Sequence, residues 1–174
     1  MSQARRQLSK VKIQVYADAS YSPSYKKAVA GYLIIGADFD SVVETKVLDE
    51  VTNIRAELVG VLWALESISS EYAIHLYTDC KAVYDLPGRR RKLEAGGFVS
   101  LRTGRPLANG ELYRRFLQVY DERQPEISWV AGHKPSHERN DEDAHFRLVD
   151  KTVRKVLRQQ IKRLAGESIK ASKP

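Results

Sequence analysis

The chain has 174 residues and a formal net charge of +7 at pH 7, a size that allows one domain with an ordinary hydrophobic core. Its single cysteine, Cys80, excludes an intrachain disulfide and a thiolate-rich metal site and is typical of a reducing compartment. The N-terminal segment has no apolar run after its positive charges, and no stretch is long enough to cross a bilayer. We therefore expect a soluble, cytoplasmic monomer without membrane contacts, and the positive charge favours a polyanionic partner.

The first half of the chain predicts three strands, a helix and a fourth strand. Segments 11–18, 28–36 and 41–48 alternate apolar and polar residues or are rich in β-branched residues, and turn-length gaps separate them, which is typical of an antiparallel meander. From Asn53 onward, apolar residues recur at helical spacing. The short apolar segment 73–79 then predicts a strand that ends in an acid.

A glycine- and arginine-rich stretch follows. Residues 81–86 can form one or two helical turns, which we expect Pro87 and Gly88 to break. From there to Pro106 the sequence predicts a loop, or a short helix flanked by loops. Positive charge gathers in GRRRK (88–92), with few acids nearby.

The last part of the chain predicts a helix, a strand and a long helix. Asn109 is expected to cap a helix that stops before Pro125. Segment 126–132 predicts a fifth strand, and apolar spacing from Phe146 to Leu164 predicts the final helix. This order of elements indicates an α/β fold with a mixed sheet and helices on its faces. Both tryptophans, Trp63 and Trp129, are expected in the core.

Three acids stand where they could converge. Asp18 and Asp79 are predicted to end the first and fourth strands, and Glu57 lies at the border of the apolar stripe of the helix between them. If those strands are neighbours, the three carboxylates come together and repel one another. Divalent cations would relieve this repulsion, and ligation by oxygen alone favours Mg²⁺ or Mn²⁺.

Five stretches together resemble the signatures of type 1 ribonuclease H. In chain order they are VYADAS, TNIRAEL, LYTDCKAV, RPLANGELY and WVAGH, and the resemblance runs from about Val11 to Val156. It implies an RNase H-like fold: a five-stranded mixed sheet, with its first three strands antiparallel, flanked by helices. It also implies hydrolysis of the RNA strand of RNA/DNA hybrids by two Mg²⁺ ions, with Mn²⁺ as a possible substitute, leaving 5′-phosphate and 3′-hydroxyl ends.

Carried over by position, the resemblance makes Asp18, Glu57 and Asp79 metal ligands and makes His133 the histidine that assists proton transfer or product release. Several further residues would hold the hybrid, by contacts to a DNA-strand phosphate, to sugar edges or through a basic protrusion. These are Thr52, Asn53, Asn109, Arg89, Arg90, Arg91 and Lys92. We expect residues 1–9 to be a flexible basic segment, 10–165 to form the catalytic domain, and 166–174 to be a flexible tail.

Departures from the family pattern concern substrate recognition. The run DASYSPSYKK replaces a glycine-rich turn, Ile54 replaces a frequent asparagine, Lys81 replaces a frequent glutamine, and the basic insertion lacks tryptophan. We therefore expect looser recognition of the hybrid, with the chemistry unchanged.

The fourth metal ligand has three candidates at the start of the last helix. Asp143 is favoured because its separation from His133 matches the family and because it lies on the flank of the apolar stripe. Glu142, which aligns with the stripe, and His145, on the opposite flank, stay as alternatives.

Other functions are also open. A DNA-directed nuclease or resolvase of the same fold would use the same acids, and an inactive nucleic-acid-binding module would keep the fold and the charge. A zinc site built from His133, His137 and Cys80 is disfavoured because Pro135 interrupts the helical spacing of the two histidines.

Overall fold

A computed structural model describes residues 10–36, 39–49, 51–130 and 140–171. Its sheet has the order β3-β2-β1-β4-β5, in which β1 pairs antiparallel with β2 and parallel with β4. β3 is antiparallel to β2, and β5 is parallel to β4. The mixed sheet expected from the sequence is confirmed. Its strands are β1 (Val11–Ser22), β2 (Lys27–Ile35), β3 (Glu44–Asp49), β4 (Tyr72–Thr78) and β5 (Glu126–Trp129).

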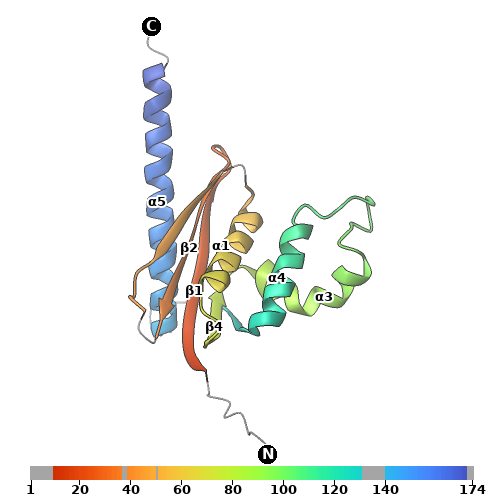
Figure 1. Cartoon of the computed structure of the whole chain (residues 1–174). Helices are drawn as coiled ribbons and strands as arrows, with labels where there is room; N and C mark the ends of the chain where they lie inside the picture. Colours follow the sequence, from red (N-terminus) through yellow and green to blue (C-terminus); the bar gives the residue numbers. More distant parts are fainter. Residues whose placement is uncertain (1–9, 37–38, 50, 131–139, 172–174) are drawn as a thin grey trace, which may run out of the picture.

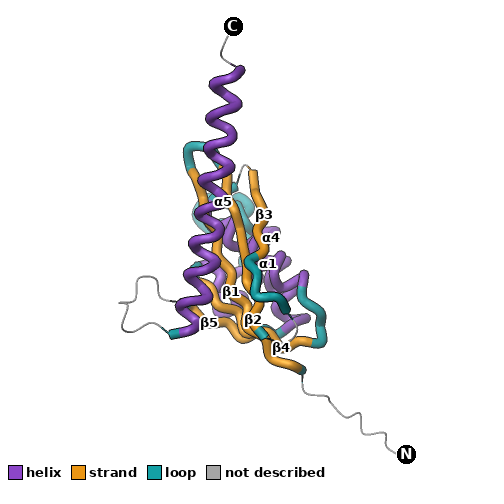
Figure 2. Tube along the Cα trace, turned by 90° about the vertical axis from the view of Figure 1, so that its left-hand side faces the viewer, coloured by secondary structure: helices purple, strands orange, loops and turns teal. Residues whose placement is uncertain are grey.

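Helices cover both faces of the sheet (Figure 1). On one side lie α1 and α4, with α3 beyond them, and α5 lies on the other side. Figure 2 shows α5 running along the sheet and continuing past its edge. None of the helices in the described part of the chain combines the length and the apolar content needed to cross a membrane. The helices are α1 (Asn53–Ser67), α2 (Lys81–Tyr84), α3 (Leu86–Ala95), α4 (Gly110–Arg123) and α5 (Asp141–Ala171).

The alternation of β1 divides the core between these two faces. Ile13, Val15 and Ala17 are buried in the cluster that contains the α1 residues, whereas Tyr16 is buried in the cluster that contains Val149 of α5. Successive side chains of a strand point to opposite faces of its sheet. A strand that is apolar on both faces can therefore carry a helix on each side.

Small residues let both helices approach the sheet closely. A Cβ added at Gly60 of α1 would lie 3.0 Å from Cβ of Ala30. On the other face, a Cβ at Gly31 of β2 would lie 2.6 Å from Cγ1 of Val153 and 3.0 Å from the carbonyl oxygen of Glu44. The contact between Gly31 and Val153 fixes the position of α5 along β2, because a larger residue cannot be accommodated there.

Several elements differ from the sequence-based expectations. β1 continues to Ser22, so Asp18 lies within the strand and does not end it. α2 ends at Tyr84, and a new helix, α3, begins at Leu86 with Pro87 in its first turn. Proline is tolerated there because the backbone N–H groups of a first turn have no helical partner. Trp129 is 47% exposed and is not a core residue. α5 reaches Ala171, within the segment 166–174 that we expected to be flexible.

Candidate active site

Three carboxylates converge at one place in the fold. Asp18 comes from β1, Glu57 from α1, and Asp79 follows β4 directly. One carboxylate oxygen from each lies within 4.8 Å of the others. Asp18 and Glu57 are buried, 7% and 6% exposed respectively, whereas Asp79 is exposed. We call these three residues the acid cluster.

Strand register and helix position explain this convergence. β1 and β4 are parallel neighbours in which Tyr16 pairs with Tyr77, so two residues further on Asp18 is level with Asp79. The N-cap of α1 is Thr52, whose Oγ1 accepts a hydrogen bond of 3.4 Å from the backbone N–H of Arg55. This cap starts α1 where its second turn brings Glu57 against the strand ends.

Burial raises the pKa of each carboxyl group in the acid cluster, and the charges of nearby acids raise it further. The pKa of Asp18 rises to about 7, through burial and then through the charges of Asp79 and Asp150. Burial, followed by the charges of Asp18 and Asp79, holds the pKa of Glu57 well above its usual range. Burial and the charge of Asp150 raise the pKa of Asp79. Such a cluster binds protons or cations more readily than isolated carboxylates do.

Glu57 also has an unused ligand atom. Its buried Oε2 has no hydrogen-bond partner among the described residues. A buried polar oxygen that accepts no hydrogen bond is costly. A cation bound between the three carboxylates would satisfy this atom.

A match to the RNase H family model extends over residues 10–156, most of the chain and all three acids. The chain belongs to the RNase H family. Ribonuclease H of Desulforamulus reducens is 30% identical over 97 residues, 53% of this chain and only 60% of that protein. Ribonuclease H of Dinoroseobacter shibae is 29% identical over 133 residues, 72% of this chain and 84% of that protein.

A solved structure supports the fold. The foamy viral protease-reverse transcriptase in complex with dsDNA superposes with a TM-score of 0.55 at 15% identity. The superposition covers 78% of this chain and 90% of that chain. At this identity the likeness shows the RNase H-like fold alone.

Asp143, the expected fourth ligand, is placed at the start of α5 and outside the acid cluster. Its Oδ2 accepts a hydrogen bond of 3.1 Å from the backbone N–H of Asn140, and Oδ1 of Asn140 accepts one of 3.0 Å from the backbone N–H of Asp143. This reciprocal pair is a capping box, which satisfies N–H groups that the helix cannot. The structure thus gives the Asp143 carboxylate a helix-capping contact.

The two alternatives to Asp143 lie in a polar and aromatic cluster against β1 and β4. Glu142 accepts a hydrogen bond of 2.8 Å from the Tyr77 hydroxyl and one of 3.3 Å from Nδ2 of Asn140. His145 lies against the ring of Tyr16, with centroids 5.2 Å apart. Neither residue belongs to the acid cluster.

Asp150 of α5, which the sequence analysis did not single out, carries a charge that acts on the acid cluster. It raises the pKa of both Asp18 and Asp79. Asp150 lies one turn before Val153, which contacts Gly31, and Gly31 pairs with Asp18 across β1 and β2. Like Asp143, it lies outside the acid cluster. Its Oδ1 forms an ion pair of 2.6 Å with Nε of Arg154.

A signal for Asp150 existed in the sequence. It follows Val149 directly and therefore lies on the flank of the apolar stripe, as Asp143 does. The separation from His133 favoured Asp143, but that separation depends on a loop of variable length. His133 itself, with the rest of 131–139, lies outside the described residues, so its role stays a prediction. The zinc alternative, which needs His133 and His137, is likewise not tested.

Two neighbouring helix starts carry Thr52 and Asn109, which are expected to hold a phosphate of the DNA strand, and Asn53, which is expected to contact sugar edges. Thr52 and Asn53 are exposed at the beginning of α1, and Asn109 is the N-cap of α4, where its side chain makes no capping hydrogen bond. An ion pair between Arg55 and Glu111 joins the first turns of the two helices. Two helix N-termini side by side favour an anion.

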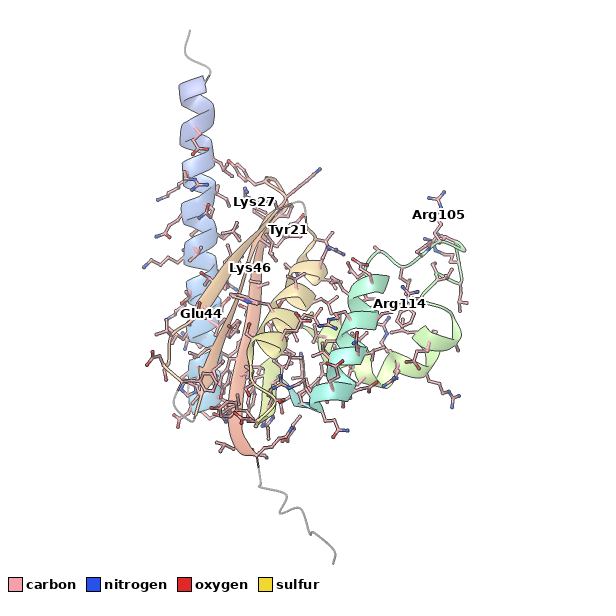
Figure 3. The ribbon with its side chains drawn as sticks, viewed as in Figure 1. Tyr21, Lys27, Glu44, Lys46, Arg105 and Arg114 are labelled. Atoms are coloured by element: carbon pink, nitrogen blue, oxygen red, sulfur yellow. The ribbon has the colours of Figure 1, made fainter. Side chains whose placement is uncertain are left out.

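The basic residues of segment 88–92 differ in their surroundings: one is held in ion pairs within the protein, and the others are exposed. Arg90 forms ion pairs with Glu94, at 2.8 Å, and with Asp121 of α4, so it fastens α3 to α4. Arg89, Arg91 and Lys92 are exposed. The loop between α3 and α4 adds Arg105, which Figure 3 shows at its outer end.

Proposed function

We propose that the chain is an endoribonuclease that hydrolyses the RNA strand of RNA/DNA hybrids and leaves 5′-phosphate and 3′-hydroxyl ends. The observation that carries this proposal is the convergence of Asp18, Glu57 and Asp79, with raised pKa values, in a member of the RNase H family. The names of its relatives support the substrate class.

The donor set fits hard divalent cations. All three ligands are carboxylate oxygens, and one buried oxygen has no hydrogen-bond partner among the described residues, so Mg²⁺ is the preferred ion, with Mn²⁺ as a substitute. When bound, two such ions would activate water and stabilise the leaving 3′ oxygen. By the resemblance to the family, Asp18 would contact both ions, with Glu57 and Asp79 beside it.

For the fourth acid we propose Asp150 in place of Asp143. Its charge reaches Asp18 and Asp79, and its backbone position is fixed by the packing of Val153 on Gly31. Asp143 already accepts the capping hydrogen bond from Asn140. Arg154 would release Asp150 when cations bind, because the ion pair is partly exposed and such pairs are weak.

We propose that the starts of α1 and α4 and the exposed cations of segment 88–92 bind the substrate. Thr52 and Asn109 would hold a phosphate of the DNA strand at the N-termini of α1 and α4, and Asn53 would contact sugar edges in the minor groove. Arg89, Arg91 and Lys92 would follow the backbone without reading sequence. His133 would assist proton transfer or product release.

A cleavage panel tests the proposal. The protein is incubated with end-labelled RNA/DNA hybrid, duplex RNA and duplex DNA, each with Mg²⁺, with Mn²⁺ or with a chelator. We expect cleavage of the RNA strand of the hybrid alone, with either metal and not with the chelator. Preferential cleavage of duplex DNA would assign the chain to the DNA-directed nucleases, and binding without cleavage would make it an inactive module.

A further inference from the structure

One face of α5 carries a row of exposed cations, which we call the cationic stripe. At 100° per residue they fall within a sector of about 100° around the helix axis. All are exposed, and apart from the adjacent pair Arg154 and Lys155 they are spaced three or four residues apart. The members of the stripe are Arg147, Lys151, Arg154, Lys155, Arg158 and Lys162.

The stripe is not neutralised within α5. The stretch 151–166 contains no acidic residue, and Arg154, which pairs with Asp150, is the only stripe member with an ion pair among the described residues. Like charges three or four residues apart repel on a helix, so Lys151 and Lys155, or Arg158 and Lys162, destabilise it slightly. A solvated surface helix usually carries intervening acids, and their absence here points to an external polyanion.

The position of the stripe relates it to the acid cluster. It lies away from Val149, Val153 and Leu157, which pack against the sheet, so it faces outward. It passes the acid cluster at Arg154, whose charge lowers the pKa of Asp18 and Asp79. From there α5 extends past the sheet at the end where α1 and α4 begin (Figure 1).

The dimensions of the stripe suit a nucleic-acid backbone. From Arg147 to Lys162 the helix rises about 22 Å, at about 1.5 Å per residue. One strand of a duplex presents a phosphate about every 3.4 Å along the axis. Because the strand also winds around that axis, a straight stripe of this length would face only a few of them. The outer part of the stripe, from Arg158 onward, also lies beyond residue 156, where the match to the RNase H family model ends.

We propose that the cationic stripe binds the phosphate backbone of the hybrid duplex outside the segment held at the acid cluster and α3. This inference rests on the proposed function, because it takes the hybrid as the ligand. The stripe would add affinity that is independent of sequence and sensitive to salt. Short hybrids would be bound and cleaved without it, and long hybrids would depend on it.

The test compares two variants that each lose three positive charges. Lys155→Gln/Arg158→Gln/Lys162→Gln removes the outer part of the stripe together with the adjoining Lys155. Lys10→Gln/Lys12→Gln/Arg163→Gln removes exposed charges elsewhere, including one on the opposite face of α5. Dissociation constants are measured against salt on hybrids of about 10 and about 30 base pairs, that is, about one and three helical turns. Lys155→Arg/Arg158→Lys/Lys162→Arg keeps the charge and should bind as the unchanged protein does.

We expect the stripe variant to bind the long hybrid at least about tenfold more weakly in 0.1 M salt, with a salt slope smaller by about 2 to 3. Its binding and cleavage of the short hybrid should change less than about twofold, because the charges removed lie outside that contact. Equal losses in the two triple variants, or equal losses on both hybrids, would overturn the inference. Failure of the unchanged protein to cleave the hybrid would count against the proposed function alone. The dissociation constants of the variants would still show whether the stripe binds the hybrid.

Discussion

The acid cluster and the cationic stripe each gather charges of one sign, but they do so in different surroundings. Asp18 and Glu57 are buried and their pKa values are raised, whereas the stripe is exposed on a helix face. Water and salt screen the stripe, and nothing screens buried carboxylates comparably. The acid cluster should therefore depend on every member and on bound cations, whereas the stripe should act through the sum of its charges.

The sharpest way to separate the two regions is to remove one acid. Asp79→Asn should keep the fold and lower metal-dependent cleavage by about 10²–10³-fold or more, because an amide neither bridges cations nor carries their compensating charge. Steady-state cleavage of the hybrid measures this loss. Asp40→Asn, an exposed change away from the cluster, is the matched control, and substantial residual activity in Asp79→Asn would remove Asp79 from the site.

A second pair of variants decides which acid of α5 completes the site. Asp150→Asn should lower cleavage by about 10-fold or more and raise the Mg²⁺ concentration required, since its charge acts on Asp18 and Asp79. Asp143→Asn should lower the free energy of unfolding by only about 0.3–1 kcal/mol, through loss of a negative charge at the N-terminus of α5. Its amide oxygen can still accept the capping hydrogen bond from Asn140, and the effect on activity should be smaller than that of Asp150→Asn. The reverse pattern in magnesium titrations and urea unfolding would restore Asp143 as the fourth ligand.

The contact that positions α5 can be broken without touching a charge. Gly31→Ala would place a Cβ 2.6 Å from Cγ1 of Val153, which should cost about 1–3 kcal/mol of unfolding free energy and displace Asp150. Adding Val153→Ala should return part of the activity by making room for the new methyl group. Gly88→Ala, where an added Cβ meets nothing within 4 Å, is the control, and urea unfolding together with cleavage rates measures all three. Full activity of Gly31→Ala would show that cleavage does not require the close packing of α5 against β2.

The raised pKa of Asp18 predicts how stability depends on pH. Its folded pKa is about 7, against an ordinary value of 3.8 for aspartate, so between these pH values the folded chain holds a proton that the unfolded chain has lost. The contribution of Asp18 to stability is therefore present at low pH and is lost as pH rises through about 7.

Without metal, we expect the melting temperature to fall by about 3–10 °C from pH 5 to pH 8 through this group, and Mg²⁺ should restore it at pH 8. Asp18→Asn should make the profile less steep, because the raised pKa values of Glu57 and Asp79 still contribute to it. The variant should also abolish the response to Mg²⁺, as measured by thermal unfolding. A melting temperature of the unchanged protein that rises from pH 5 to pH 8 without metal would contradict the raised pKa of Asp18.

The smallest effect is expected from a single change in the stripe. Arg158→Gln should weaken binding of a long hybrid by only about two- to fivefold and reduce the salt slope by about 1, because the other exposed cations remain. Dissociation constants at several salt concentrations measure it, with Arg163→Gln on the opposite face as the control. A loss as large as that caused by an acid-cluster variant would mean that Arg158 makes a specific contact.

Local sequence determined much of this protein. The alternation of β1, the helical spacing after Asn53 and the acids Asp18, Glu57 and Asp79 could all be assigned from neighbouring residues, because secondary structure and the family motifs are short-range patterns. The convergence of these three acids was predicted and is confirmed.

Tertiary structure decided the rest. Which acid of α5 faces the cluster depends on how far the helix slides along the sheet, and the contact of Val153 with Gly31, 122 residues apart in sequence, sets that position. The use of Arg90 in ion pairs with α4, and the exposure of Trp129, likewise depend on partners distant in the chain. Long-range packing of this kind leaves no periodic signal in one sequence, so only the folded arrangement could reveal it.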